Sequence, residues 1–489
     1  MTNNRKPIIG KFMLDSISIG MYNHPLMVMR EYIQNSVDSI DEICNNRLIK
    51  RDEAKIEINI DGRNRSILIK DNGGGIPAEK VWDAIYNIGK SEKQPSVNRG
   101  FRGIGRLGGL GYCDELRFKT KAHGENIYTI SIWDSKKLRQ LINESNSSID
   151  AVNIVKIITK FSQHKYYGSK SDHFFIVEMD NVKSSKDICL DVPEVKSYLS
   201  QVAPVPFEHT NFSFSKKIEE KLIKRVPSYG VYNIYVNGEK IFKPYNNIVR
   251  IGLKQKDKIQ DIDFVEFKND EGELAFGWIA KLQLLGSINS SNFFDGIRVL
   301  CGNILVGNKS LLSGFFREER FNNYLVGEIY ITNGKLILNS RRDDFEDNKH
   351  KEGFYNSFVK EIGIPYSRKI REASEERSRK KIQKRQIGII DEADKIIQYG
   401  FLAEDQKNTV ISKLKNIKKD RKYMNDNERI DSLIKKVERA KHYLDRCKKR
   451  ISKKGKVKLK EIFETIYELC NNKIEAEKIV NNIMKKEIL

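Results

Sequence analysis

Three polar residues near the start of the chain have the types and the spacing that chemistry requires. In REYIQNSVDSID, Glu31, Asn35 and Asp38 stand four and then three residues apart, so they share one face of a helix. Carboxylates and amides are side chains with which proteins handle protons and hold hard cations. A solvated polar face is the alternative, because acids and amides normally line the wet side of a surface helix. The motifs that follow this helix in the sequence decide between the two interpretations.

Two glycine-rich segments follow it. The strand-like SILIK runs into DNGGGIP, where Asp71 precedes Gly73, Gly74 and Gly75. Such glycines allow positive φ angles or let a ligand approach the backbone, although an ordinary tight turn is the alternative. The second segment, RGFRGIGRLGGLG, can present backbone N–H groups to phosphate oxygens, and its arginines add positive charge. It fits neither the dinucleotide fingerprint nor the Walker loop.

The elements that would hold these residues follow from periodicity. Apolar residues at helical spacing predict a helix over 26–49, and alternation predicts a hairpin of strands at 55–60 and 66–72. A short helix is expected at 78–89, and then a polar loop over 89–111 whose length is typical of functional or disordered segments. Further strands are predicted within 112–180 and at 232–242, 296–307 and 325–338. This part of the chain is therefore expected to be mixed α and β.

The character of the chain changes after Pro365. From 366 to 489 there is no proline, and charged helical sequence replaces strand-like alternation. Gaps of three and four residues define a seam of three heptads, which could pair with another chain or pack inside a bundle, with the bundle slightly favoured. Its members are Ile430, Leu433, Val437, Ala440, Leu444, Cys447 and Ile451.

Length and charge bound the class of protein. The chain has 489 residues, enough for about two to four domains, and a net charge of +22. Residues 1–125 carry a net +4, residues 126–365 a net +3 and residues 366–489 a net +15. The excess therefore predicts a separate basic module, and nucleic acid is its leading candidate partner.

The remaining composition indicates a reduced, non-membrane protein. The six cysteines lie far apart without a C-x-x-C pair, which argues against structural zinc and a disulfide framework. No apolar run approaches the length of a membrane span, and Lys11 and Asp15 stand where a signal peptide would be apolar. We therefore expect a cytoplasmic protein that does not enter a membrane.

The ordered triple of motifs resembles the GHKL ATPase superfamily, which includes gyrase B subunits, MutL, the ninety-kilodalton heat-shock chaperone and the MORC proteins. The triple is E-x-x-x-N-x-x-D on a helix, D-x-G-x-G after a strand, and a glycine-rich lid, and the resemblance covers about residues 10–180. It implies an α+β fold. We expect a GHKL (Bergerat) α/β sandwich domain over 1–185 with its lid at 89–111, a transducer-like α/β domain over 186–365, and an all-α basic region over 366–489.

The resemblance also implies roles at the water and adenine ends of an ATP site. Glu31 would be the general base that activates the attacking water, and Asn35 would ligate Mg²⁺. Asp71 would accept a hydrogen bond from the adenine amine. Asp38 would order waters or contact the ribose side. Gly73, Gly75 and Ile76 would lie against the base.

Other positions would hold the phosphates or belong to the lid. The phosphate-binding positions implied are Gly100, Arg102, Gly103, Ile104, Gly105 and Arg106. Lys90 and Lys93 would belong to the lid, with a solvated loop as their alternative. One departure concerns a Gly-Thr pair that family members place on a later strand beneath the adenine, because the corresponding SKSDHFFIVEMD lacks it. The floor of the adenine pocket is therefore undefined at this stage.

A second match lies far downstream, in KLILNSRRDDFED. In the heat-shock chaperone and MORC patterns a basic residue here senses the γ-phosphate, which implies Arg342, with Arg341 as the neighbour that could substitute. A surface cluster of ion pairs with Asp343 and Asp344 is the alternative, and such clusters contribute little stability.

The function implied is an Mg²⁺-dependent ATPase whose N-terminal lobes close or form a homodimer on ATP. We expect an ATP-gated clamp on duplex DNA that binds through the basic region 366–489. The alternatives are a chaperone-like or scaffold ATPase acting on a protein client or partner subunit, and a solvated helical bundle that binds another subunit. Kinase activity is not expected, because only His24 precedes Glu31.

Overall fold

The computed structural model describes residues 8–18, 20, 24–89, 103–144, 149–419, 427–446, 451–470 and 472–487. The chain divides into two compact units, Met1–Ile370 and Arg371–Leu489, here called unit 1 and unit 2. Unit 1 contains two main β-sheets, and we call each sheet with its helices a lobe. Unit 2 is helical in its described residues. This arrangement confirms the predicted combination of α/β architecture and a helical C-terminal region.

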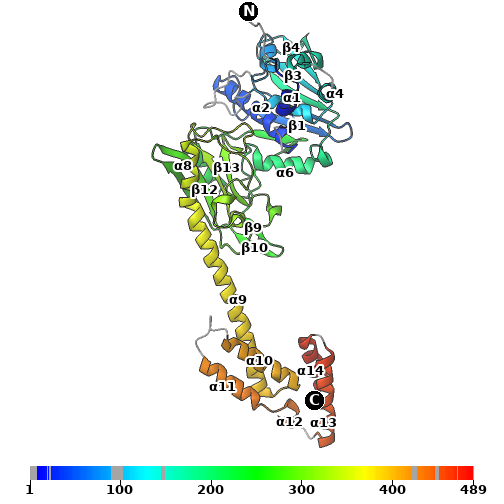
Figure 1. Ribbon diagram of the computed structural model, residues 1–489, viewed down its shortest axis with the longest axis vertical. Helices are drawn as coiled ribbons and strands as arrows, with labels where there is room; N and C mark the ends of the chain where they lie inside the picture. The colour runs from blue at the N-terminus through cyan, green and yellow to red at the C-terminus, as the bar shows by residue number, and fades with distance from the viewer. Residues whose placement is uncertain are drawn as a thin grey trace, which may run out of the picture. The chain divides into compact units, whose positions relative to one another are not determined.

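The first lobe is built on an eight-stranded sheet in the order β5-β4-β3-β6-β2-β1-β7-β8 (Figure 1). Its neighbouring strands pair antiparallel, except that β1 and β7 are parallel. The strands are β1 (Lys55–Asp61), β2 (Ser66–Asp71), β3 (Glu115–Lys121), β4 (Ile127–Asp134), β5 (Thr159–Lys165), β6 (Phe174–Asp180), β7 (Asn233–Val236) and β8 (Glu239–Lys240).

Helices complete this lobe, and one hydrophobic core joins them to the sheet. They are α1 (Phe12–Ser18), α2 (Met27–Asn45), α3 (Val81–Tyr86), α4 (Ser135–Asn143), α5 (Ala151–Ile158), α6 (Val192–Val202) and the short 3₁₀ helix η1 (Gly105–Gly111). The stripe on α2 that includes Met29, Ile33 and Val37 is fully buried, because its spacing keeps it on one face of the helix.

The β1–β2 hairpin shows why the motif residues lie where they do. Ile56, Ile58 and Ile60 alternate with exposed residues on β1, as a half-buried strand requires. In the turn, the Asp61 carboxylate accepts hydrogen bonds from two following backbone N–H groups. The register then brings Asp71, the last residue of β2, to a buried position at the end of the strand.

The second lobe holds a five-stranded sheet in the order β11-β12-β15-β13-β14. Trp278 lies at the centre of its core, among aromatic rings from several elements. The strands are β11 (Asp261–Asn269), β12 (Gly272–Lys281), β13 (Gly296–Cys301), β14 (Ile304–Leu305) and β15 (Val326–Ile331), and a separate hairpin is formed by β9 (Ile248–Ile251) and β10 (Gln255–Lys258). The helices are α7 (Ser215–Arg225) and α8 (Lys349–Phe358).

The strand predicted over 325–338 is too long. It ends at Ile331, because the N–H groups of Thr332 and Asn333 both donate to the carbonyl of Leu274 and the chain then turns. The turn carries the following residues away from the sheet and towards the segment that contains Arg342.

Helix α9 (Ile364–Tyr399) follows α8 through one π-helical turn, Val359–Gly363. Pro365 lies just after that turn. A proline has no N–H to donate to the preceding turn, and a π turn accommodates such a break without ending the helix. The helical region therefore includes Pro365 and begins before residue 366.

Unit 2 packs around two separate hydrophobic clusters. Besides the end of α9, its helices are α10 (Glu404–Lys419), α11 (Asn427–Glu438), α12 (Tyr443–Arg446), α13 (Lys453–Leu469) and α14 (Lys473–Glu487). The predicted seam of three heptads does not lie on one continuous helix, although its described residues pack inside the helical bundle, which was the favoured interpretation. α11 ends at Glu438, and His442, whose Nε2 atom lies 2.9 Å from the Leu402 carbonyl oxygen, is in the break before α12. The seam divides between the two clusters, and Cys447 lies outside the described residues.

Within the described part of the chain, no helix is long and apolar enough to cross a bilayer. The five cysteines that the structure describes are all free thiols.

Candidate functional site

Glu31 lies where three elements of unit 1 meet. It is on the second turn of α2, and its side chain is buried. Its Oε2 atom is 3.2 Å from Nη1 of Arg342, and its Oε1 atom is 3.7 Å from Nη2 of Arg30. A Cβ atom placed on Gly105 would be 2.5 Å from Oε2, so the backbone of η1 also reaches this carboxylate. The polar face of α2 is therefore not a solvated face at this residue.

Arg342 reaches Glu31 from the second lobe, and its backbone has a positive φ of 56°. Such a φ is unusual for a residue with a side chain and is held here by the surrounding turn. Its N–H donates to the carbonyl of Asn339, and its own carbonyl accepts from Gly307. The Asn339 amide binds the carboxylate of Asp343 at 2.6 Å, which closes the turn.

Arg30 ties α2 to the same part of the second lobe. Its guanidinium donates to the carbonyls of Leu305 and Arg341 at 3.5 and 3.4 Å. Arg341 itself is exposed, so Arg342 is the arginine that faces Glu31. The cluster of ion pairs that would join Arg341 and Arg342 to neighbouring acids is not formed in the described residues, because Asp344 instead pairs with Lys351 at 2.9 Å.

Three buried polar atoms, two on α2 and one on Arg342, lack a hydrogen-bond partner among the described residues. They are Nε of Arg30, Oε1 of Gln34 and Nη1 of Arg342, whose contact with Glu31 is an ion pair without hydrogen-bond geometry. Buried donors without acceptors are costly unless a ligand or water satisfies them. The two arginines thus have donor capacity for an anion.

Asp71 is buried at the other end of the site. Its carboxylate accepts a hydrogen bond from the hydroxyl of Ser36 at 2.6 Å and from the backbone N–H of Gly73 at 2.9 Å. Burial raises the pKa of Asp71 to about 6, while these two hydrogen bonds act in the opposite direction. A carboxylate fixed in this way presents its remaining acceptor capacity in a defined direction.

The glycines after Asp71 are required by close contacts. A Cβ on Gly73 would lie 2.4 Å from the Ser39 hydroxyl, and a Cβ on Gly75 would lie 2.1 Å from the carbonyl of Lys121. Gly75 also has a φ of +66°, which favours glycine. The backbone of this loop therefore lies close to α2 and β3.

Several residues at this end were missed by the sequence analysis. Ser36 fixes Asp71, the Thr120 hydroxyl accepts from the N–H of Ile76 at 2.8 Å, and Nδ1 of His173 contacts the Gly73 carbonyl at 2.7 Å. Thr120 is the buried threonine next to the motif loop, and it comes from β3 rather than from SKSDHFFIVEMD. Of these three residues, only Ser36 had a signal in the sequence, because it directly follows Asn35.

The remaining predicted residues fall into three groups. Asn35 is half-buried and Asp38 is buried on α2, beside Glu31 in sequence. Gly103, with a φ of +68°, and Ile104 lead into η1. Lys90, Lys93, Gly100 and Arg102 lie outside the described residues.

Arg106 has a different set of partners. Its guanidinium donates to the carbonyls of Ile85 and Asn87 at 3.2 and 2.9 Å, at the end of α3. Burial lowers its pKa to about 10. In this structure Arg106 thus joins η1 to α3, and its role towards phosphate stays a prediction.

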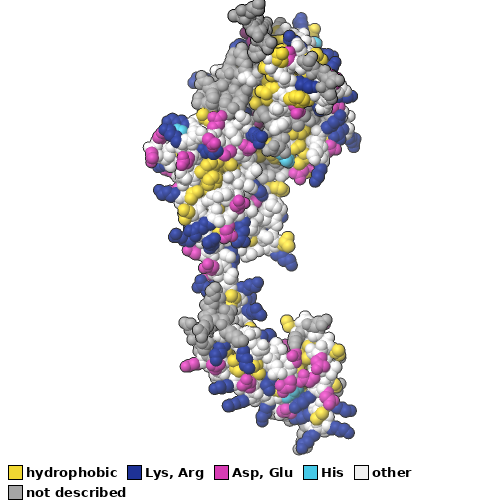
Figure 2. Space-filling view, in the orientation of Figure 1, with side chains coloured by type: hydrophobic (Ala, Val, Ile, Leu, Met, Phe, Trp, Pro, Cys, Tyr) yellow, Lys and Arg dark blue, Asp and Glu magenta, His cyan; other side chains and the backbone are white. Residues whose placement is uncertain are grey.

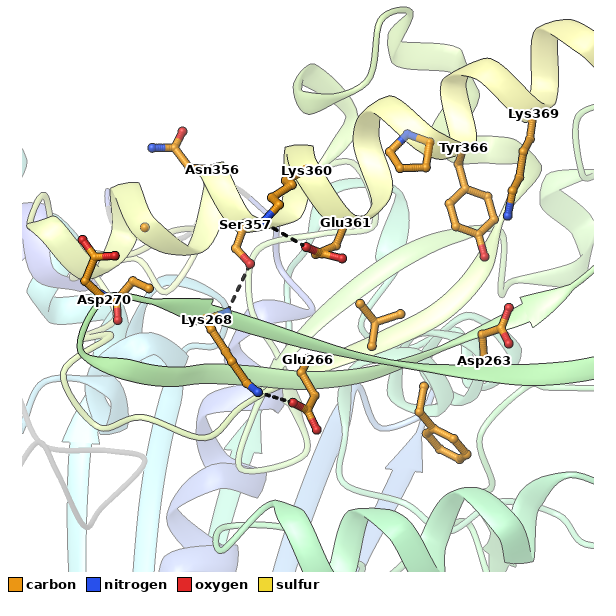
Figure 3. Close-up of a pocket in the computed structure, with 15 residues that line it drawn as sticks. Asp263, Glu266, Lys268, Asp270, Asn356, Ser357, Lys360, Glu361, Tyr366 and Lys369 are labelled. Carbon is orange, nitrogen blue, oxygen red and sulfur yellow. Dashed lines mark hydrogen bonds and ion pairs between the residues drawn. The ribbon is translucent and has the colours of Figure 1, made fainter.

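A cavity of about 870 Å³ lies elsewhere, between the edge strand β11 and the α8–α9 helices (Figure 3). None of the candidate site residues lines it. Its charged groups are largely engaged, since Lys268 pairs with Glu266 and Asp263 pairs with Lys281. We therefore do not place the candidate chemistry there.

The first lobe contains the part of the chain that is similar to known proteins. Residues 22–164 match the family model described as "Histidine kinase-, DNA gyrase B-, and HSP90-like ATPase". This part of the chain is a GHKL-type ATPase domain that resembles Hsp90.

Two relatives show how far the similarity reaches. Chaperone protein HtpG of Clostridium botulinum (strain Langeland / NCTC 10281 / Type F) is 31% identical over 143 residues, covering 26% of this chain and 22% of the relative. Chaperone protein HtpG of Rickettsia canadensis (strain McKiel) is 26% identical over 208 residues, covering 38% and 32% respectively. The matches thus span less than a third of the length of these relatives.

Proposed function

We propose that this protein is an Mg²⁺-dependent ATPase whose ATP site is completed by the second lobe, and that it acts as an ATP-gated clamp on duplex DNA. The contact between Glu31 and Arg342 carries the first part of this proposal. It joins a carboxylate of the GHKL-type domain to a cation from a segment 311 positions later in the chain, at 3.2 Å and away from solvent. Two different lobes therefore supply the two charged groups.

In the proposed reaction Glu31 accepts a proton from the attacking water as the bond from water to the γ-phosphorus forms and the bond to ADP breaks. Arg342 neutralises charge that develops on the γ-phosphoryl oxygens. The donors of Arg30 and Arg342 that lack partners support this assignment, since a triphosphate would supply their acceptors. Arg30 acts as a positioning residue, because it binds Glu31 and the second lobe at once.

Asp71 would recognise the adenine amine. The hydroxyl of Ser36 and the N–H of Gly73 fix its carboxylate, so its remaining acceptor capacity has a defined direction for the ligand. A Cβ at Gly73 or Gly75 would clash with Ser39 or with the Lys121 carbonyl, so glycines at both positions let the loop lie against α2 and β3 in the conformation proposed to face the base. His173 and Thr120 hold the loop in place.

The residues present also fit Mg²⁺. Mg²⁺ in nucleotide sites is held mainly by phosphates and water, with only one or two protein oxygens. Asn35 would contribute its amide oxygen, and the ion would neutralise phosphate charge when bound with ATP.

The DNA part of the proposal rests on residues 366–489, which hold 35 basic and 20 acidic side chains. Figure 2 shows Lys and Arg side chains projecting from the helices of unit 2. α13 begins with five lysines among its first eight residues. Cations at a helix N-terminus oppose the helix dipole, so this sequence costs local stability unless an anion is near.

The proposal includes a homodimer formed on ATP binding, with the two copies enclosing the DNA. The test is the steady-state ATPase rate of the full chain, with and without a duplex oligonucleotide, at two salt concentrations. We expect DNA to stimulate the rate at low salt and to lose this effect at high salt, because phosphate contacts release counterions. A rate that DNA leaves unchanged, but an unfolded protein client stimulates, would support the chaperone-like alternative instead.

A further inference from the structure

The β9–β10 hairpin of the second lobe carries an unusual arrangement of charge. It comprises β9 (Ile248–Ile251), β10 (Gln255–Lys258) and the turn between them. The antiparallel register sets Arg250 directly opposite Lys256, and Ile248 directly opposite Lys258. Like charges in directly opposed positions destabilise a strand pair.

Because side chains alternate along each strand, the basic residues and the single acid of the hairpin lie on opposite faces. Val249, Ile251 and Asp257 are buried against the body of the lobe, while Arg250, Lys256 and Lys258 are exposed. Asp257 is fixed on the inner face, where its carboxylate accepts from the N–H groups of Lys258 at 2.8 Å and Gln283 at 3.0 Å. The outer face therefore has basic residues and no acid.

The local excess of charge is large for such a short segment. Residues 248–258 carry four basic side chains and one acid, a net +3, which equals the net charge of the whole region 126–365. Within the described chain, none of these four basic side chains forms an ion pair, although lysines elsewhere on this lobe do. The sequence thus balances charge across the rest of the region and leaves it unbalanced on this hairpin.

The turn exposes one apolar side chain, and two asparagines bind the backbone of the hairpin. Leu253, next to Gly252 with its φ of +54°, is 97% exposed. Two asparagines fix the hairpin from the loop before β13: the Asn289 amide donates to the Gly252 carbonyl at 2.8 Å, and the Asn292 amide donates to the Arg250 carbonyl at 3.0 Å. In Figure 1 the hairpin lies at the edge of unit 1, and Figure 2 shows basic and hydrophobic side chains on the surface there.

We propose that the β9–β10 hairpin is a second nucleic-acid contact, separate from the basic helices. Arg250, Lys256 and Lys258 bind phosphates of duplex DNA, and Leu253 packs against sugars or base edges in a groove. The inference rests on the proposed function for the identity of the partner. A two-stranded ribbon fits the major groove, about 12 Å wide, and a closely spaced row of phosphates relieves the repulsion between opposed cations.

The experiment measures the affinity of the full chain for a labelled duplex by fluorescence anisotropy across a salt series. The hairpin variant carries Arg250→Gln, Lys256→Gln and Lys258→Gln. We expect the slope of log affinity against log salt to fall by about 3, roughly one for each phosphate that the three side chains bind, and affinity at moderate salt to fall at least about tenfold. Leu253→Ser should weaken binding without changing the slope, because it removes no charge.

A matched control removes the same charge from lysines that already have acidic partners: Lys268→Gln, Lys335→Gln and Lys349→Gln. The melting temperature of the hairpin variant should equal or exceed that of the wild type, since the variant removes repulsion. If the hairpin variant melts at a lower temperature than the wild type, a second variant, Arg250→Lys, keeps the charge at this position. The inference then requires Arg250→Lys to bind DNA as the wild type does. A hairpin variant that binds no worse than the control overturns the inference.

A third variant, with Lys453→Gln, Lys454→Gln and Lys458→Gln on α13, separates this inference from the proposed function. Weakening by the hairpin variant alone supports the hairpin and removes the basic helices from DNA binding. Weakening by the α13 variant alone supports DNA binding by the basic helices and overturns the inference about the hairpin. Binding of the wild type to anionic phospholipid vesicles, with none to DNA, overturns both in favour of a membrane surface.

Discussion

The substitution Gly105→Ala tests whether the position of the Glu31 carboxylate controls turnover. The new Cβ would lie 2.5 Å from Oε2 of Glu31 and 3.5 Å from its Cδ. Ordinary contacts begin near 3.4 Å, so the oxygen has to move by roughly 0.9 Å. Because the clashing atom is the end of a side chain, the carboxylate yields and the fold stays intact.

A displacement of this size has a calculable effect on the rate. Misplacing a reacting group by about 1 Å costs on the order of 100-fold, so kcat should fall about 100-fold, or about 2.7 kcal/mol in activation free energy. A strained rotamer costs about 0.5–1.5 kcal/mol, so the melting temperature should fall by only a few degrees. The affinity for ATP should not change, because the oxygen that moves activates water and does not bind the nucleotide.

The assay is the steady-state ATPase rate, combined with calorimetric titration of ATP and thermal melting. Gly74→Ala is the matched control in the same site, since its Cβ would meet nothing nearer than 4.0 Å. If Gly105→Ala retains kcat within about threefold of the wild type, the position of Glu31 does not limit the reaction and the reasoning is wrong. A loss of ATP affinity instead would assign Gly105 to phosphate binding.

Three further substitutions test the other groups of the site. Glu31→Ala should reduce turnover by at least about 100-fold while ATP still binds, as measured by rate and by titration. Asp71→Asn should abolish measurable ATP binding. It should also remove a pH dependence: with a folded pKa of about 6 and an unfolded value of 3.8, the folded wild type binds the extra proton between them, so wild-type stability falls by about 3 kcal/mol as pH rises from about 4 to 6. Arg342→Ala should lower kcat by about 10- to 1000-fold while the exposed Arg341→Ala has little effect, and equal effects would refute the assignment.

Local patterns predicted the elements that hold the first motif residues. Helix α2 and the β1–β2 hairpin follow from apolar periodicity, because neighbouring residues in sequence decide which face of each element is buried. The burial of Glu31 was not predictable in this way. Periodicity places it opposite the apolar stripe, and it is buried because η1 and the segment around Arg342 cover that face.

The partners of the motif loop could not be read from sequence for the same reason. Thr120 and His173 meet Ile76 and Gly73 only because β6 lies between β3 and β2 in the sheet. Strand order is set by packing across the whole sheet, whereas alternation reports only the two faces of one strand.

The break in the heptad seam could not be predicted for a related reason. A repeat of apolar residues at gaps of three and four continues across two short helices as readily as along one long helix. Here the Phe401 carbonyl accepts from Tyr443 and the Leu402 carbonyl contacts His442, so the chain breaks between α11 and α12. Contacts from a distant segment interrupted the helix without altering the apolar pattern.

The geometry of Arg342 has a consequence for how the two lobes communicate. Its positive φ is unfavourable for a residue with a Cβ and persists because the turn from Asn339 to Asp344 fixes it through backbone and side-chain hydrogen bonds. The backbone of the second lobe therefore fixes the direction in which the Arg342 side chain leaves the main chain. Any event that shifts this turn changes the charge facing Glu31 without touching the nucleotide. If the protein is the proposed ATPase, such a shift would be enough to couple hydrolysis to a partner bound to the second lobe.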